Sequence, residues 1–218
     1  MKGIRAVGFA VAVSAAAPAF AAPDCYLGLT AASVFGRSQH VHSSRFAFTD
    51  TFDVNGRGVG AQFGCLAARD RWLYGAAVDL TDTQAKGNAQ ELPPNQDIFA
   101  ETAIEWIGTM RAIGGYQLDS RTMVYLTGGL AFSAMKIRVC GVTGPFAGTC
   151  GVSSENLWGV VGGVGARVQL WRRWSLNAEY LAFGFENKEF PRPGAFSDRG
   201  GGIRPEAQLL RAGLSFHF

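Results

Sequence analysis

The feature that most constrains this chain is a period-two alternation of apolar side chains with polar or small ones. In segment 124–133, Val124, Leu126 and Leu130 share one face, and Tyr125, Thr127 and Ser133 share the other. This period predicts a β-strand with two different faces. The same alternation recurs in seven further segments, 26–31, 59–65, 72–81, 105–112, 158–169, 176–180 and 210–218.

The connections between these segments alternate in length. Three are tight and mostly polar (69–71, 119–122 and 171–174), whereas four are long (37–57, 84–102, 138–155 and 186–204). Short turns at one end and long loops at the other are typical of outer-membrane barrels. Aromatic residues near the strand ends fit an interfacial girdle: Trp72, Tyr116, Trp171, Trp174 and Phe218. The fold predicted is all-β, an eight-stranded antiparallel up-and-down transmembrane β-barrel.

Alternation alone also fits a soluble barrel, in which the large apolar residues point inward. Three features favour the membrane barrel, in which they face lipid. The loop lengths alternate regularly. The chain ends with apolar residues at alternate positions up to Phe218. Glycines gather on the polar face, where side chains crowd a narrow interior: Gly28, Gly60, Gly64, Gly75, Gly129, Gly163, Gly165 and Gly213. A closed barrel also pairs every backbone group, as lipid requires.

The first residues have the pattern of a secretory signal peptide. Lys2 and Arg5 form a basic start, an apolar stretch follows, and Ala19-Phe20-Ala21 is an A-x-A cleavage site. We therefore expect residues 1–21 to be removed by cleavage after Ala21, leaving 22–218 as the barrel in a bacterial outer membrane. Without Lys2 and Arg5, 18 basic groups face 17 acidic ones. This near-neutral balance does not suggest a nucleic-acid partner.

Four cysteines in an exported chain permit disulfides, and four cysteines allow three pairings. Cys140 and Cys150 bracket a short segment that contains Gly, Pro and Thr, so a bridge there would clamp a loop. Cys25 and Cys65 would then pair by elimination. A metal site is the alternative, but the sequence has no CxxC and its histidines lie elsewhere.

Several strands resemble one known family. Segment 105–116, EWIGTMRAIGGY, resembles the fourth strand of the small porin-like outer-membrane proteins of alphaproteobacteria, the outer-membrane immunogenic proteins. Segments 124–131, 174–180 and 210–218 resemble their fifth, seventh and last strands. The family shares the eight-stranded barrel of the OmpA transmembrane domain. The resemblance implies that Phe216 and Phe218 belong to the signal read by the barrel-assembly machinery. Family members usually lack cysteine, and commonly carry an acid where this chain has Ala77.

Strand parity places six charged residues in the lumen, with a sum of zero: Asp79, Glu105, Arg111, Arg167, Glu179 and Arg211. Because a buried charge without a partner is costly, we expect the three arginines to contact Glu105 and Glu179, with Asp79 a weaker member. An eight-stranded interior is just wide enough for side chains to fill. A plugged lumen is favoured, and a narrow solute or ion pore is the alternative.

Candidate chemistry is sparse. His40 and His42 could share a metal on a strand, but no third ligand is evident, so no metal site is predicted. Ser215 and His217 share a face, yet at the periplasmic end and inward, which disfavours a lipid A-modifying enzyme. We expect no catalytic residue and no cofactor. The role predicted is a structural, surface-exposed envelope protein whose partners are outer-membrane lipid, lipopolysaccharide and the barrel-assembly machinery.

Overall fold

The computed structural model describes residues 23–38, 40–42, 49–90, 98–144, 147–186, 188–190, 201–203 and 206–218. The predicted signal peptide lies outside these residues, so its cleavage stays a prediction. In the described part of the chain, no helix has the length and apolar character needed to cross a membrane.

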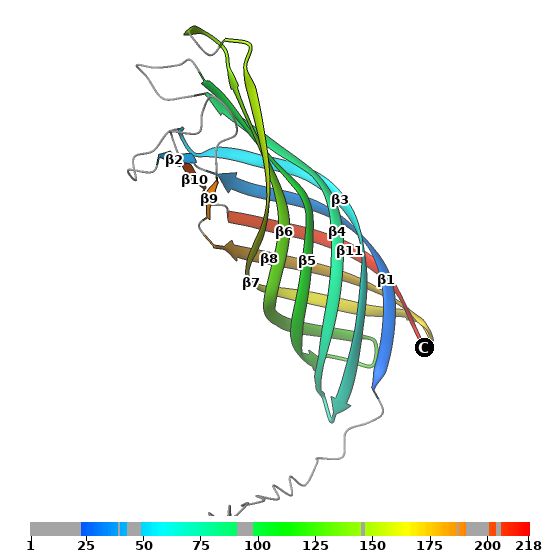
Figure 1. Ribbon diagram of the computed structural model, residues 1–218. Helices are drawn as coiled ribbons and strands as arrows, with labels where there is room; N and C mark the ends of the chain where they lie inside the picture. Colours follow the sequence, from blue (N-terminus) through cyan, green and yellow to red (C-terminus); the bar gives the residue numbers. More distant parts are fainter. Residues whose placement is uncertain are drawn as a thin grey trace, which may run out of the picture.

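Eight strands form one closed antiparallel barrel, in the order β1-β11-β8-β7-β6-β5-β4-β3 (Figure 1). The barrel strands are β1 (Asp24–Ser38), β3 (Phe52–Arg69), β4 (Trp72–Gln90), β5 (Ile98–Gln117), β6 (Thr122–Gly141), β7 (Cys150–Trp171), β8 (Trp174–Phe185) and β11 (Glu206–His217). A separate small sheet has the order β2-β10-β9 and joins β2 (His40–His42), β10 (Gly201–Ile203) and β9 (Lys188–Phe190). The predicted fold class is therefore confirmed.

The first and last barrel strands close the cylinder. β1 pairs with β11 from Tyr26 opposite His217 to Arg37 opposite Glu206. The backbone N–H of Phe218 donates to the carbonyl of Cys25 at 3.0 Å, which extends the seam to the final residue. Closure leaves no unpaired edge, which is the condition for a sheet in lipid.

The periplasmic connections are tight turns, as the sequence predicted. Between β5 and β6, the Asp119 carboxylate accepts hydrogen bonds from the backbone N–H of Arg121 (2.7 Å) and Thr122 (2.9 Å). These two hydrogen bonds lower the pKa of Asp119, because they stabilise its ionised form. Between β3 and β4, Asp70 takes the left-handed conformation with φ of 57°.

The opposite end differs from the prediction, because much of the expected loops is strand. β4 continues to Gln90 and β5 starts at Ile98, so most of 84–102 is sheet. Likewise β6 runs to Gly141 and β7 starts at Cys150, within the expected loop 138–155. A bilayer needs only about 9–11 residues per strand, whereas β4 to β7 have 19 to 22. These strands are therefore longer than a bilayer requires, and Figure 1 shows them projecting past the ends of β8 and β11 at one end of the barrel.

The outward face carries an apolar band bounded by aromatic side chains. Leu29 is 73% exposed and Leu126 67% exposed on the outer wall, where lipid covers them. At the periplasmic edge, Trp72 packs edge-on against Tyr116, with ring centroids 5.1 Å apart, and Trp174 packs against Phe216 at 5.2 Å. On β4 the outward residues change from apolar at Leu80 to polar beyond it. The large apolar residues thus face lipid.

Two disulfides link neighbouring strands, and both are the predicted pairs. Cys25 on β1 is bonded to Cys65 on β3, and Cys140 on β6 to Cys150 on β7. Each pair consists of directly opposed residues in its ladder. The first bridge lies near the periplasmic end and the second near the outer end of the extended strands.

Glycines on the inner face permit close approach of neighbouring backbones. A Cβ built on Gly129 would lie 2.0 Å from the Met110 carbonyl oxygen, and one on Gly75 would lie 2.0 Å from that of Cys65. No side chain fits at either position without moving a strand. On the outer wall, by contrast, a Cβ on Gly114 would meet nothing within 4 Å.

The lumen is layered along the barrel axis. Its outer half is filled by a large cluster of buried apolar side chains, and the buried charged side chains lie at mid-height. The periplasmic half mixes buried polar groups with a smaller cluster of Tyr26, Leu66, Ala77, Ile113, Met123 and Tyr125. This differs from the expectation of a polar interior throughout. The apolar layer comprises Ala32, Val34, Val54, Ala85, Ile98, Ile104, Ile107, Ala131, Met135, Ile137, Val139, Leu157, Val161, Leu181, Phe183, Phe185, Ala207 and Leu209.

Candidate functional site

Four buried charged side chains form a closed ring of ion pairs at mid-height in the lumen. Asp79 (β4) and Glu179 (β8) each contact both Arg111 (β5) and Arg211 (β11). Arg111 lies 2.9 Å from Asp79 and 3.2 Å from Glu179, and Arg211 lies 2.7 Å from Asp79 and 2.5 Å from Glu179. The four side chains are at most 3% exposed. We call these four residues the charge quartet. It ties four strands together across the barrel.

Neutral groups complete the hydrogen bonding of the quartet. The Tyr125 hydroxyl donates to Glu179 at 2.8 Å, and the Thr109 hydroxyl donates to Asp79. Arg111 Nε donates back to the Thr109 oxygen at 2.9 Å. Buried charges are tolerated when they are paired and their remaining donors and acceptors are satisfied. Asp79, expected as a weaker member, thus bridges both arginines as fully as Glu179.

Glu105 does not lie in the lumen, contrary to the sequence analysis. The ladder between β5 and β6 shifts register between Ile104 and Trp106, so a bulge forms at Glu105. An extra residue reverses strand parity on one side of it. As a result Ile104 and Ile107 both point inward, at 3% and 1% exposure, while Glu105 is exposed on the outer wall.

Arg167 lies in the lumen as expected but outside the charge quartet. Its guanidinium carbon lies 3.9 Å from the centroid of the Tyr26 ring, a cation–π contact. Within the described residues, its Nε and Nη1 atoms are buried and have no hydrogen-bond partner. The lumen therefore holds three arginines and two acids.

A second polar cluster lies at the periplasmic mouth. The Ser175 hydroxyl lies 2.8 Å from His217 Nε2, and His217 Nδ1 lies 2.6 Å from the Asp24 carboxylate. This order resembles a serine hydrolase triad, but Ser175 is fully buried. Sequence reasoning paired His217 with Ser215 instead. Ser215 faces the same side of the strand, but its hydroxyl contacts other residues: it accepts a hydrogen bond from Gln62 at 3.0 Å and donates one to Asn177 at 3.4 Å.

The mouth cluster joins the first and last strands of the barrel. Asp24 begins β1, and His217 ends β11, so their contact spans the closing seam of the barrel. A nucleophilic serine must reach its substrate, whereas Ser175 is buried. The contact between Asp24 and His217 links the two strands that close the barrel.

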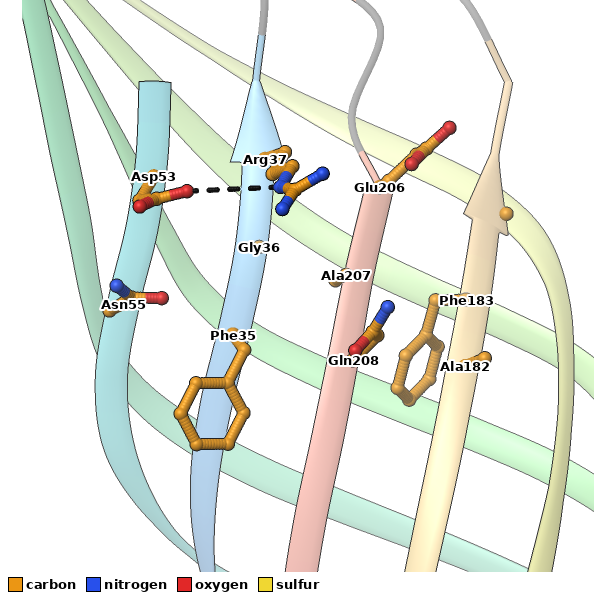
Figure 2. Close-up of a pocket in the computed structure, with 11 residues that line it drawn as sticks. Phe35, Gly36, Arg37, Asp53, Asn55, Ala182, Phe183, Glu206, Ala207 and Gln208 are labelled. Carbon is orange, nitrogen blue, oxygen red and sulfur yellow. Dashed lines mark ion pairs between the residues drawn. The ribbon is translucent and has the colours of Figure 1, made fainter. Parts of the chain in front are cut away.

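A groove of about 510 Å³ lies on the outer wall at the extracellular rim, across β3, β1, β11 and β8. Figure 2 shows Phe35 between Asn55 and Gln208, below the ion pair of Arg37 with Asp53. That pair is exposed at 3.9 Å, so it contributes little stability. A second polar surface lies across β4, β5 and β6, where Lys86, Lys136 and Arg138 point outward above the apolar band.

No metal centre is formed by the described residues, which contain no group of three histidine, cysteine or acidic side chains that could hold an ion. His40 and His42 form β2. Their side chains lie outside the described part, so the metal hypothesis for this pair is untested.

A model of the outer membrane protein beta-barrel domain matches residues 6–218. The chain belongs to this outer-membrane β-barrel family. It is also 31% identical over 166 residues to the 31 kDa outer-membrane immunogenic proteins of Brucella melitensis and Brucella suis. Each match covers 72% of this chain and 68% of the relative. The resemblance seen in the strands is thereby confirmed, and the location is the bacterial outer membrane.

Solved structures share the fold at low sequence identity. OprG from Pseudomonas aeruginosa is 11% identical, with a TM-score of 0.56, over 89% of this chain and 96% of that one. The outer membrane protease OmpT from Escherichia coli is 9% identical, with a TM-score of 0.56, over 93% of this chain and 99% of that one. At this identity the likeness concerns the barrel fold alone.

Proposed function

We propose that this β-barrel is a non-enzymatic envelope protein with a closed lumen, whose task is structural and surface-exposed. The observation that carries the proposal is the two-layer filling of the interior. The charge quartet crosses the lumen at mid-height, and the apolar layer lies on its extracellular side. An ion would have to break the quartet and then enter an apolar layer, which is costly for a charge.

Packing directly above the quartet supports this closure. Leu181 and Leu209 are directly opposed on β8 and β11, and both are at most 1% exposed. They lie two residues beyond Glu179 and Arg211 on the same inward face. The paired charges and the paired leucines thus block consecutive levels of the barrel.

We further propose that lipopolysaccharide is the main partner of the outer wall. Lys86 and Lys136 both lie opposite Ala103 in their ladders, so the two ammonium groups flank one small residue. Arg138 lies two residues beyond Lys136 on the same face. Glu101, which lies directly opposite Arg138, and Glu105 line the same surface, so its net charge is +1. Its three cations above the apolar band suit the phosphates of an outer-leaflet lipid. The barrel-assembly machinery is the partner during insertion, through Phe216 and Phe218.

Planar-bilayer recording tests the closed lumen. We expect the mature protein to show no steady conductance in concentrated potassium chloride. The R111A variant opens the quartet, and an L181A/L209A variant thins the apolar layer, so the combined variant serves as the positive control for insertion. Steady single-channel conductance of the unmodified barrel would support the pore alternative and refute the closed lumen.

Mass spectrometry of lipid A tests the absence of enzymatic activity. Lipid A from cells with the protein, without it and with an S175A variant should give the same profile. A mass shift that depends on the protein and disappears in S175A would identify the mouth cluster as a catalytic site and overturn the non-enzymatic proposal.

A further inference from the structure

One charge in the lumen has no counter-charge among the buried side chains. The buried charged residues of the lumen are Arg111, Arg167, Arg211, Asp79 and Glu179, which sum to +1. The four members of the quartet neutralise one another. The excess therefore belongs to Arg167, which is 5% exposed. Burying a cation without an anion costs several kcal/mol.

The contacts of Arg167 leave two of its nitrogen donors unused. Stacking on the Tyr26 ring at 3.9 Å attracts the positive charge through the ring face, but it satisfies no N–H group. Nε and Nη1 remain buried and without a hydrogen-bond partner in the described chain. Buried donors without a partner are rare in folded proteins, and a bound water molecule or ion is one explanation for them.

A third unused donor lies on the neighbouring strand. Asn177 is directly opposite Arg167 in the β7–β8 ladder, and it is 1% exposed. Its carbonyl oxygen accepts hydrogen bonds from Gln62 at 3.0 Å and from Ser215 at 3.4 Å. Its amide nitrogen Nδ2 is buried and has no partner within the described residues. The Nε and Nη1 groups of Arg167 and the Nδ2 group of Asn177, on adjacent strands, thus have no acceptor among the described residues.

We propose that Arg167 and Asn177 form a binding site for one small inorganic anion of halide size. The anion accepts hydrogen bonds from both side chains and balances the excess positive charge. Water could accept the same hydrogen bonds but would leave the charge uncompensated. The Tyr125 ring covers the neighbouring Gly165, since a Cβ built there would lie 2.4 Å from the ring, so the site is closed on that side.

The layering of the lumen sets the route of entry. The Tyr26 ring, on which Arg167 stacks, lies 5.6 Å from the His217 ring of the mouth cluster. The site is therefore one level inside the periplasmic mouth. The quartet and the apolar layer lie on its other side, so the anion exchanges with the periplasm and does not cross the barrel.

The test uses the mature barrel folded in an uncharged detergent. Its urea unfolding midpoint is measured in sodium chloride and in sodium gluconate of equal ionic strength, because gluconate is too large for the site. Chloride at ten times its dissociation constant should raise the folded-to-unfolded ratio about elevenfold. Chloride binding is also measured directly as excess broadening of the ³⁵Cl magnetic resonance signal, which bromide should displace.

Three variants separate this site from general salt effects. R167M removes the cation, and N177D supplies a resident carboxylate opposite it, so both should lose the chloride dependence and the ³⁵Cl broadening. N177D should fold at least as stably in gluconate as the unmodified barrel does in chloride. R173M, at an exposed position in the turn after β7, should retain both effects. Equal chloride dependence in N177D and the unmodified barrel, or no ³⁵Cl broadening in the latter, overturns the proposal.

Discussion

Neutralising Glu179 is the sharpest test of the charge quartet. E179Q keeps the shape of the side chain and removes its charge. The carboxylate accepts from Arg211 at 2.5 Å, from Tyr125 at 2.8 Å and from Arg111 at 3.2 Å. In the variant, both arginines would share Asp79 alone, and the excess charge of the lumen would rise. Breaking a buried ion pair by removing one partner costs about 3–5 kcal/mol, so we expect a loss of about 4 kcal/mol.

Urea unfolding in lipid vesicles, followed by the fluorescence of the five tryptophans, measures this loss. E105Q is the matched control, because Glu105 is exposed on the outer wall, and it should change stability by no more than about 0.5 kcal/mol. The double variant E179Q/R211Q should be less destabilised than the sum of the single variants by about 2 kcal/mol, since neither charge is left alone. A cost below about 1 kcal/mol for E179Q, or an equal cost for E105Q, refutes the quartet as described.

Three further predictions concern the bridges, the turn and the inner wall. In the chain-entropy model, removal of the Cys25–Cys65 disulfide, with a sequence separation of 40, should lower the free energy of unfolding by about 4 kcal/mol. Removal of Cys140–Cys150, with a separation of 10, should lower it by about 3 kcal/mol. Equal urea midpoints with and without either disulfide would contradict this prediction. D119A should destabilise the barrel at pH 7, because the pKa of Asp119 is lowered in the folded state. The stabilisation from the ionised carboxylate is present above its usual pKa of 3.8 and is lost as the pH falls below that value. A destabilisation by D119A that does not change between pH 7 and pH 2 would refute this prediction. Gly129→Ala should block folding and abolish the gel shift between heated and unheated samples, because its Cβ would meet backbone atoms. Gly114→Ala should fold normally, because its Cβ would meet nothing within 4 Å. Similar behaviour of the two variants would contradict the close backbone approach at Gly129.

Strand parity predicted most of the barrel because lipid and lumen impose opposite demands on alternate residues. Val78 and Asp79 differ by one position, and each lies on the face that its polarity indicates, outward at 43% and inward at 9% exposure. Both disulfides were also predicted, Cys140–Cys150 because the two residues bracket a short segment and Cys25–Cys65 by elimination. The ladders place each pair directly opposite one another.

Parity failed where the ladder is irregular. Glu105 follows the alternation of 105–112 in sequence, but the bulge beside it depends on how β5 meets its neighbours, which sequence spacing does not show. The strand extensions were missed for a related reason. Beyond Leu80 the outward residues of β4 are polar, beginning with Asp82. The sequence there resembles a loop, although pairing with β5 continues to Gln90.

The partners within the lumen were also beyond the reach of sequence. Parity identifies which charges point inward. That Asp79 belongs to the quartet, and Arg167 does not, depends on the height of each residue along the tilted strands, which parity does not give. Asp24 was missed at the mouth because it lies far from His217 in sequence, although both are end residues of strands that close a barrel. That closure was the only feature that could have indicated their contact.

The central claim is that apolar residues face lipid and polar ones face a filled interior. Site-directed spin labels at Ala76, Ala77 and Val78, and at Leu126, Thr127 and Gly128, test it directly in vesicles. The spin labels at the outward-facing positions of the two segments should be highly accessible to dissolved oxygen: Ala76, Val78, Leu126 and Gly128. Those at the inward-facing Ala77 and Thr127, which are 3% and 7% exposed, should be poorly accessible. High oxygen accessibility at Ala77 and Thr127, or no alternation in either triplet, would contradict the account.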